Sequence, residues 1–532
     1  MKSRILPLLI LVCLALGTVV PASAEEPATR EIVRIEGTTA VENEILMELG
    51  FEIAAARPGE WTDLVVSPSD KDRLARLDYP IVASRQLPVS IPSQYHVYAE
   101  MLAALEQYAA TYPEITVLED IGDGWGKIYN DPNNYPAFDI WALKISDNAA
   151  TDEAEPAILY TGVHHAREPV TVEICLGIAE VLLTEYGTDP VVTAWVDSHE
   201  TWIVPLVNPD GHWCVTDVNW TDWRKNMRDN DGNGYITEPG WWTYPDGVDN
   251  NRNYDWEWGG QGSSGNPSEQ TYRGPSPFSE PENQAIRDLA YRENFAFSVD
   301  YHSYGELILY PYGYDAVTEA PDDALLREIA EGVESRIQNG YVAAQAHDLY
   351  PAAGASLDWH YGAYNSMALL IETATEFIPP GTAIAGIVEE NLRGARYIQE
   401  RADGPGVRGI VRIEGVPGEA TVELVGIDDP PLNTIRKSHP IVGDYYRITQ
   451  PGTWTLRFHV DGYDDQEFEV DVPSDGFVTL DVDFGTPQDV ADLDDPSALR
   501  FAVGPNPARG EVGFHYALPA GCDEARVRVH DL

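Results

Sequence analysis

The segment Tyr160–Pro169 constrains this chain more than any other, because it places a histidine and a glutamate three residues apart at a turn. His165 and Glu168 follow the apolar run 157–160, which is typical of a buried strand, and precede a proline at a favoured helix-start position. An imidazole and a carboxylate at this spacing can hold one metal ion. A turn from strand to helix is also where open α/β sheets place ligands. An H-x-x-E pair is common by chance, so a metal site is predicted only if further ligands occur elsewhere in the chain.

A third ligand and a carboxylate base are predicted at the ends of two later strands. Catalytic zinc commonly takes three protein ligands plus water. The apolar run 295–302 ends in His302, and the run 367–372 ends in Glu372. We expect His302 to complete the metal site and Glu372 to lie at its rim. Taken singly, a core histidine and a surface carboxylate are the alternatives.

The segments between these strands carry a resemblance to a known family. They are a tight turn at 208–211, a cationic segment at 223–226, and the segments 247–254, 302–313 and 350–359. In this order, over about residues 92–400, they resemble the zinc carboxypeptidases of the carboxypeptidase A and T type, in a secreted bacterial form. The resemblance implies an α/β fold whose mixed, eight-stranded type of sheet has helices on both faces.

The resemblance also implies a role for each matching residue. The implied zinc ligands are His165, Glu168 and His302. The implied catalytic residues are the general base Glu372 and the carbonyl-polarising Arg224. The implied substrate-binding residues, which hold the C-terminal carboxylate or line a neighbouring subsite, are Asn251, Arg252, Tyr350 and Arg167. His164 is outside the family pattern, so we expect it either to contact a metal ligand from behind or to have no role in the reaction.

These residue types explain the chemistry. Zinc lowers the pKa of a bound water from 15.7 to about 7. Glu372 would take the water's proton and hand it to the leaving amine. Arg224 supplies fixed positive charge where the oxyanion develops. Arg252 can bind a carboxylate through two parallel hydrogen bonds, which predicts action at chain ends.

An apolar pocket is expected for the C-terminal side chain. By resemblance, it is lined by Leu309, Leu349, Leu357 and Leu370. Relatives that prefer basic ends carry an acidic residue at or near the Leu357 position. Leucine there favours hydrophobic or aromatic ends, and a polar Gln345 facing the pocket would broaden the preference.

A second cation site is predicted in an insertion. Asp229, Asp231 and Asn233 alternate and are followed by glycine, which is the opening of a calcium loop. The twelfth position is Gly240, so Glu238, Asp246 or Asp249 would have to replace the usual glutamate. A polar turn without an ion remains the alternative.

Composition and pattern divide the chain into five parts. Residues 1–24 are typical of a secretory signal peptide. Residues 25–88 alternate β-α-β-α-β and resemble a ferredoxin-like propeptide, with a permanent accessory domain as the alternative. Residues 89–403 are the predicted catalytic domain. Residues 404–487 predict a transthyretin-like β-sandwich, and residues 488–532 an acidic linker and part of an Ig-like sorting module.

Partners and location follow from charge and targeting. The formal net charge of −53 argues against binding to nucleic acid or to an anionic membrane surface. No run outside the signal peptide is long enough to span a bilayer. We therefore expect a secreted monomer that acts on peptides, with surface association through the C-terminal module. Cys175, Cys214 and Cys522 would remain after processing, and a bridge between the first two stays open.

Three functions compete. The first is a secreted metallocarboxypeptidase. The second is a related zinc amidase that acts on cell-wall peptides. The third is a surface protein with an inert peptidase part, which the presence of Glu372, Arg224 and Arg252 argues against.

Overall fold

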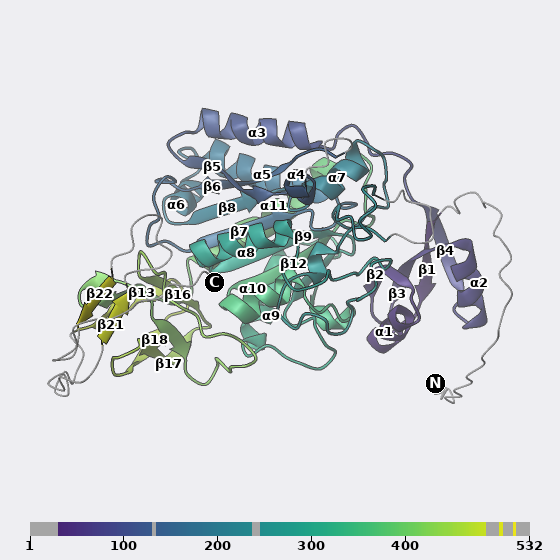
Figure 1. Ribbon diagram of the computed structural model, residues 1–532. Helices are drawn as coiled ribbons and strands as arrows, with labels where there is room; N and C mark the ends of the chain where they lie inside the picture. The colour runs from purple at the N-terminus through teal and green to yellow at the C-terminus, as the bar shows by residue number, and fades with distance from the viewer. Residues whose placement is uncertain (1–29, 130–134, 237–244, 486–499, 504–513, 518–532) are drawn as a thin grey trace.

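A computed structural model of the chain describes residues 30–129, 135–236 and 245–485, together with the backbone of two short strands (Figure 1). Those strands, β21 (Arg500–Val503) and β22 (Phe514–Ala517), pair antiparallel. The predicted signal peptide and most of the segment 488–532 lie outside the described residues. Among the described helices, none has the length and apolar character needed to cross a bilayer.

The central sheet has eight strands in the order β11-β10-β12-β9-β7-β8-β6-β5. The strands are β5 (Thr116–Asp123), β6 (Asp139–Ile145), β7 (Ala157–Gly162), β8 (Glu200–Val204), β9 (Phe297–Ser303), β10 (Leu307–Tyr310), β11 (Val342–Gln345) and β12 (Met367–Thr373). The central strands β12, β9, β7 and β8 are parallel, whereas β6 and β10 run antiparallel to their inner neighbours. The predicted mixed sheet is thus confirmed.

Helices cover both faces of this sheet. One face packs against α3 (Tyr98–Thr111), α5 (Val170–Glu185), α6 (Pro190–Val196), α9 (Asp323–Ile337) and α11 (Ile384–Ala402). The other face packs against α8 (Pro281–Glu293) and α10 (Ser356–Tyr364). The alternation in β7 shows why: Ile158 belongs to the first core and Leu159 to the second. Fully burying such a side chain contributes about 1.5–3 kcal/mol relative to exposure.

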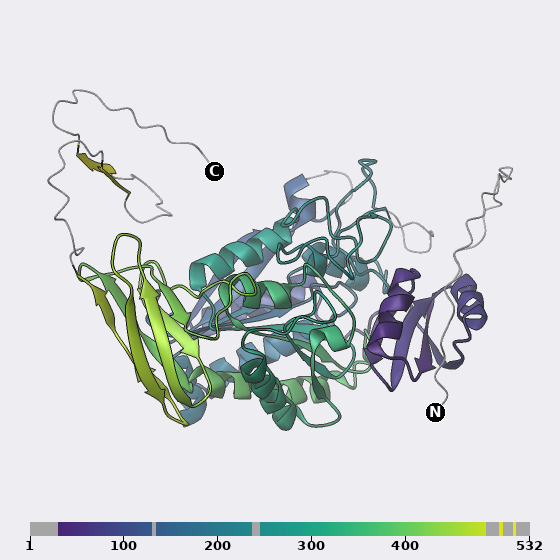
Figure 2. The same ribbon diagram turned by 90° about the horizontal axis from the view of Figure 1, so that it is seen from below.

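An N-terminal α+β domain lies at one end of the molecule (Figures 1 and 2). Its elements are β1 (Glu31–Glu36), α1 (Ala40–Glu48), β2 (Glu52–Arg57), β3 (Trp61–Val66), α2 (Pro68–Arg76) and β4 (Ile81–Gln86). The antiparallel order β2-β3-β1-β4 and the β-α-β-β-α-β succession are those of a ferredoxin-like fold. Our β-α-β-α-β pattern missed β2, because its three consecutive alanines have low strand propensity.

A β-rich domain lies at the opposite end (Figure 2). One of its sheets is built around β13 (Gly406–Ile413), and the other has the order β15-β17-β18. The remaining bounds are β14 (Val416–Pro417), β15 (Thr421–Leu424), β16 (Asp444–Ile448), β17 (Gly452–His459), β18 (Gln466–Val472), β19 (Phe477–Thr479) and β20 (Val482–Phe484). The two sheets enclose an apolar core that includes Val411, Val422 and Phe458. The sequence pattern missed β18, in which charged residues alternate with apolar ones.

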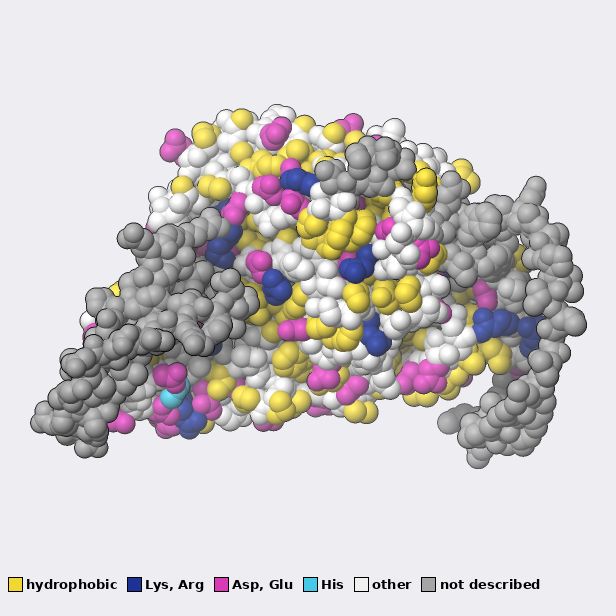
Figure 3. Space-filling view, in the orientation of Figure 1, with side chains coloured by type: hydrophobic (Ala, Val, Ile, Leu, Met, Phe, Trp, Pro, Cys, Tyr) yellow, Lys and Arg dark blue, Asp and Glu magenta, His cyan; other side chains and the backbone are white. Residues whose placement is uncertain are grey.

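Short elements complete the described chain: α4 (Trp125–Tyr129), α7 (Pro209–Thr216), and the 3-10 turns Asn250–Arg252 and Ala346–Asp348. Cys175 and Cys214 are both buried and unbridged, so the possible disulfide between them is not formed. On the face in Figure 3, carboxylates and the fewer cations are interspersed among the described side chains.

Candidate active site

The three predicted metal ligands converge at the carboxyl ends of two neighbouring parallel strands. His165 and Glu168 lie in the turn after β7, and His302 lies near the end of β9, its neighbour in the sheet. Glu168 Oε1 lies 2.8 Å from His165 Nδ1, and Glu168 Oε2 lies 2.9 Å from His302 Nδ1. The two Nδ1 atoms are 3.1 Å apart. A tetrahedral zinc ion with ligands at 2.0–2.1 Å separates its donors by about 3.3 Å, so this buried donor set fits zinc.

Each histidine has a carboxylate within hydrogen-bonding distance of its far nitrogen. Asp249 Oδ1 lies 3.2 Å from His165 Nε2, and Asp300 Oδ2 lies 2.9 Å from His302 Nε2. A carboxylate beside one ring nitrogen of a metal-binding histidine favours the proton on that nitrogen. Neither role was predicted. Asp300 precedes His302 by two residues on one strand, so the alternation of β9 was a usable signal.

Electrostatics at His165 and Glu168 suit a cation, whereas at His302 the carboxylates of Asp300 and Glu168 outweigh burial and raise the pKa, so a metal ion there would have to displace a proton. Burial and the guanidinium of Arg224 lower the pKa of His165. Burial opposes ionisation of Glu168, but His165 and His302 hold its pKa below the ordinary value. A neutral imidazole and an ionised carboxylate are the forms that bind metal.

Glu372 lies beside this triad. It is at the end of β12 and pairs in register with His302 on β9. Its Oε2 atom is buried and has no hydrogen-bond partner among the described residues. Burial and the neighbouring carboxylate of Glu168 raise the pKa of Glu372 to about 8. A divalent cation nearby would favour ionisation of this carboxyl group.

Two arginines approach the triad from the loop side. The Nε and NH2 groups of Arg224 donate to Asp249 Oδ2 at 3.1 and 2.8 Å. Arg252 donates from Nε to the carbonyl of Gly262 at 2.9 Å, and from NH1 to the carbonyl of Asn251 at 2.7 Å. Both guanidinium groups are therefore fixed by the protein before any substrate arrives.

A pocket joins the metal triad to the predicted specificity residues. Its lining includes His165, Arg224, Asn251, Arg252, Tyr350, Glu372, Leu309, Leu349, Leu357 and Leu370. Gln345 does not line the pocket, and its side-chain amide donates instead to the carbonyl of Thr318 at 3.0 Å. Asp358, which we did not predict, also lines the pocket and accepts from the backbone of Gly313. Burial raises the pKa of Asp358 to about 7.

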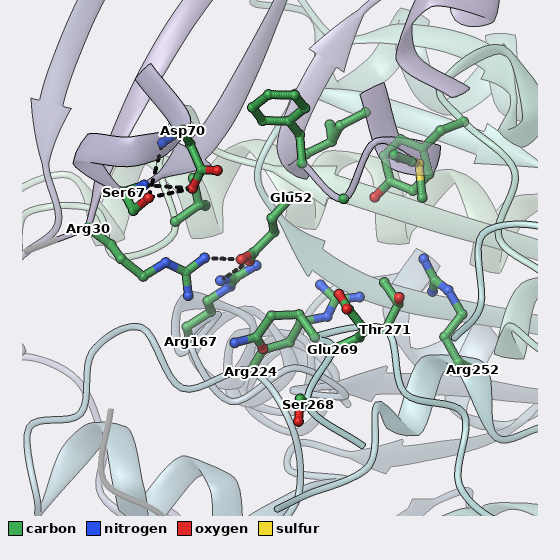
Figure 4. Close-up of a pocket in the computed structure, with 17 residues that line it drawn as sticks. Arg30, Glu52, Ser67, Asp70, Arg167, Arg224, Arg252, Ser268, Glu269 and Thr271 are labelled. Atoms are coloured by element: carbon green, nitrogen blue, oxygen red, sulfur yellow. Dashed lines mark hydrogen bonds and ion pairs between the residues drawn. The ribbon is translucent and has the colours of Figure 1, made fainter. Parts of the chain in front are cut away.

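Arg167 lies apart from this pocket, under the N-terminal domain. Its NH1 group lies 2.6 Å from Glu52 Oε1 and 3.0 Å from Asp222 Oδ1. Arg30 pairs with the same two carboxylates, as Figure 4 shows for Glu52. The guanidinium of Arg167 also stacks on the ring of Phe377, 4.1 Å from its centroid. This cluster joins the N-terminal domain to the wall of the cleft.

The predicted calcium loop forms a turn closed by its own hydrogen bonds. Asp229 accepts from the backbone of residues 232, 233 and 234, and Asp231 accepts from Asn233. Asp249 does not complete the loop, because it faces His165 and Arg224. Asp246 accepts from the backbone of residue 230, and Glu238 lies outside the described residues. Calcium binding stays a prediction.

Comparison with known proteins identifies the family. The family model for zinc carboxypeptidases matches residues 101–394. A zinc carboxypeptidase of Saccharothrix mutabilis subsp. capreolus is 30% identical over 339 residues, covering 60% of this chain and 72% of that protein. Carboxypeptidase A4 of Mus musculus is 29% identical over 316 residues, covering 58% and 70%. The structure of carboxypeptidase A from Helicoverpa armigera has a TM-score of 0.58 at 21% identity, and covers 71% of this chain and 98% of its own.

The chain therefore belongs to the zinc carboxypeptidase family. It is a metallocarboxypeptidase, a zinc-dependent peptide hydrolase.

Proposed function

We propose that this enzyme removes the C-terminal residue of peptides through His165, Glu168 and His302 as zinc ligands and Glu372 as general base. The observation that carries the proposal is the convergence of these four groups at the ends of three neighbouring strands. Zinc held there would supply a Lewis acid that polarises the scissile carbonyl and acidifies a water molecule. The unpartnered, buried Oε2 of Glu372 is free to accept a proton from that water.

Arg224 and Arg252 have separate roles, in stabilising the oxyanion and in binding the terminal carboxylate. Arg224 stabilises the oxyanion as the tetrahedral carbon forms, because its charge is fixed by Asp249 and needs no reorganisation. Arg252, Asn251 and Tyr350 bind the terminal carboxylate. A cation held at this end of the pocket selects chain ends over chain interiors.

The leucines of the pocket favour hydrophobic or aromatic C-terminal residues, because Asp358, the acidic residue that also lines it, already accepts from the backbone of Gly313 through both oxygens. We expect a panel of peptides that differ only at the last residue to be hydrolysed fastest with leucine or phenylalanine, and slowly with lysine or glutamate. The rate is measured as release of the free amino acid. Faster release from peptidoglycan stem peptides would support the amidase alternative, and no release from any substrate would support an inert domain.

The N-terminal domain is proposed to be a propeptide that covers the cleft. A cavity between this domain and the cleft is lined by Phe51, Glu52 and Ile53 on one side and by Arg224, Arg252 and Tyr350 on the other (Figure 4). Asn43 Nδ2 donates to the carbonyl of Leu349, a pocket residue, at 3.3 Å. Although burial opposes ionisation, Arg30 and Arg167 lower the pKa of Glu52 to about 2. A peptide substrate would have to displace these contacts.

A second set of contacts fixes the other side of the domain. Tyr304 donates from its hydroxyl to Asp63 Oδ2 at 2.9 Å, and Arg57 donates to the carbonyl of Gly340 at 2.7 Å. Arg85 stacks on the ring of Tyr304, 4.7 Å from its centroid. The proline- and serine-containing segment 84–90 predicts a cut near Arg85. Arg85 itself belongs to the paired strand β4, so the part of the connector after it, where Val89 is 90% exposed, is the better site for the cut.

Cutting this connector should raise activity. We expect a preparation starting at Glu25 to hydrolyse a small chromogenic peptide at least about tenfold faster after limited proteolysis, because a bound domain reduces the population of open cleft. Glu52→Gln should raise the activity of the uncut form, whereas the exposed Glu60→Gln on the same domain should not. Equal rates before and after the cut would make residues 25–88 a folding aid or an accessory domain.

The remaining proposals concern location and assembly. We propose that the enzyme is secreted through residues 1–24, is monomeric, and associates with the cell surface through the C-terminal module. The proposals of secretion and of surface association rest on the sequence patterns of residues 1–24 and 488–532.

A further inference from the structure

Behind the metal triad lies a buried hydrogen-bond network that the proposed reaction does not use directly. Its centre is Asp300, whose two oxygens are shared by four donors. Oδ1 lies 2.9 Å from Thr161 Oγ1 and 2.9 Å from His164 Nδ1. Oδ2 lies 2.9 Å from His302 Nε2 and 2.6 Å from Ser356 Oγ. The carboxylate therefore joins the end of β7, strand β9 and the first residue of α10.

The network continues away from the metal site. His164 Nε2 lies 2.8 Å from the hydroxyl of Tyr254, whose ring packs against Trp359 of α10. His164 and Tyr254 are both almost completely buried. Each imidazole nitrogen of His164 thus has a polar partner, and the ring has no position left for a substrate. His164, which the family pattern did not explain, is thus a buried member of this network.

The donors His164, Asp300 and His302 also lie close enough together to hold a metal ion of their own. The individual contacts favour a network of hydrogen bonds. Asp300 accepts through both oxygens, and each histidine presents to it a nitrogen at N–H···O distance. A carboxylate that already accepts four hydrogen bonds has no lone pair left for a cation.

We propose that Asp300, held in place by His164 and Tyr254, is a positioning residue that fixes the metal-binding face of His302. With Nε2–H donated to Asp300, the imidazole must present Nδ1 to the metal, and rotation of the ring would break the contact. Asp249 does the same for His165, but its carboxylate also binds Arg224. Asp300 contacts no residue assigned to the substrate, so its loss should act on the metal and not on peptide binding.

The proposal rests on the zinc-ligand roles given above and is tested by zinc affinity. Asp300→Asn replaces one acceptor oxygen by a donor, so His302 and His164 can no longer both be satisfied. We expect the zinc Kd, from competition with a chromogenic chelator, to rise about 10- to 100-fold. Tyr254→Phe removes only the distant hydroxyl and should raise the Kd by a few fold. The rise in Tm that zinc causes should be reduced most in Asp300→Asn and less in Tyr254→Phe.

The chain offers a matched control. Asp322 is about as buried as Asp300 and accepts from the hydroxyl of Tyr361 at 3.1 Å, away from the metal triad. Asp322→Asn and Tyr361→Phe therefore measure the general cost of breaking a buried Asp–Tyr contact. We expect both to leave the zinc Kd within about twofold of wild type, whatever they do to the Tm of the metal-free protein.

The outcomes separate this proposal from the proposed function. Wild-type protein that binds no zinc at one equivalent contradicts the ligand assignment itself. Wild-type binding together with unchanged affinity in a folded Asp300→Asn overturns only the positioning role. If Asp300→Asn does not fold, His164→Ala is compared with His164→Asn, whose amide can replace the Nδ1–H donor. Zinc affinity equal to wild type in the alanine variant then overturns the proposal, and loss in alanine with recovery in asparagine supports it.

Discussion

Glu372→Gln should lower kcat by about 10²- to 10⁴-fold while zinc stays bound, because general acid–base catalysis typically contributes a factor of that size. The loss corresponds to about 3–5 kcal/mol of transition-state stabilisation. The amide has nearly the volume of the carboxylate but cannot accept the proton of the attacking water. Steady-state kinetics on a free-acid peptide and metal analysis of the same sample measure both parts.

Glu293→Gln is the control for this substitution. Glu293 is also a buried glutamate with a raised pKa, caused mainly by burial, but it lies at the end of α8 beside Arg292. Its replacement should change Tm without changing kcat. Near-wild-type turnover in a zinc-loaded Glu372→Gln enzyme would refute the assignment of the base and leave the metal ligands standing.

Arg252→Ala should lower kcat/KM for free-acid peptides by about 10²-fold or more, because removing one partner of a buried ion pair costs about 3–5 kcal/mol. The change should fall mainly on KM if the carboxylate is held equally in the ground and transition states. The two carbonyl contacts that orient Arg252 in the free enzyme support this role, since they set the guanidinium in place before binding.

Amidated peptides supply the matching comparison. The wild-type enzyme should cleave an amidated peptide far more slowly than the free acid, and Arg252→Ala should narrow that difference. Arg252→Lys keeps the charge but loses the planar guanidinium group. Its preference for the free acid over the amidated peptide should therefore lie between those of the wild type and of Arg252→Ala. If the wild type cleaved amides and acids at equal rates, exopeptidase action through Arg252 would be wrong.

The predictability of the fold differed between its parts for physical reasons. The core strands β7, β9 and β12 were visible because strands buried on both faces are continuous apolar runs. Strand β2, with three alanines, carries a weak local signal and is fixed by pairing with β3. Strand β18 does alternate apolar and charged residues, as a half-buried strand does, but its Glu and Asp residues have low strand propensity, and pairing with β17 fixes it. The order of strands in the sheets also depends on such long-range pairing, which local periodicity does not contain.

The candidate site shows the same division. The sequence alone indicated the candidate metal ligands and base, since His165 and Glu168 lie between an apolar run and a helix start, and His302 and Glu372 each lie at the end of an apolar run. It could not show that Asp249 belongs to the metal site and not to a calcium loop, or that Gln345 turns away from the pocket. Those outcomes depend on which backbone and charged groups lie within hydrogen-bonding distance, and folding brings these groups from distant segments.

What the sequence determined by itself was the class of chemistry, because donor types and their spacing along strands and turns are local properties. What only the tertiary structure decided was the support around them. Asp300 and His164, 136 residues apart in the chain, meet at 2.9 Å. The N-terminal domain likewise reaches Arg167 through Glu52. Such contacts form because buried charges require partners, and the fold, not the sequence separation, determines which partners are near.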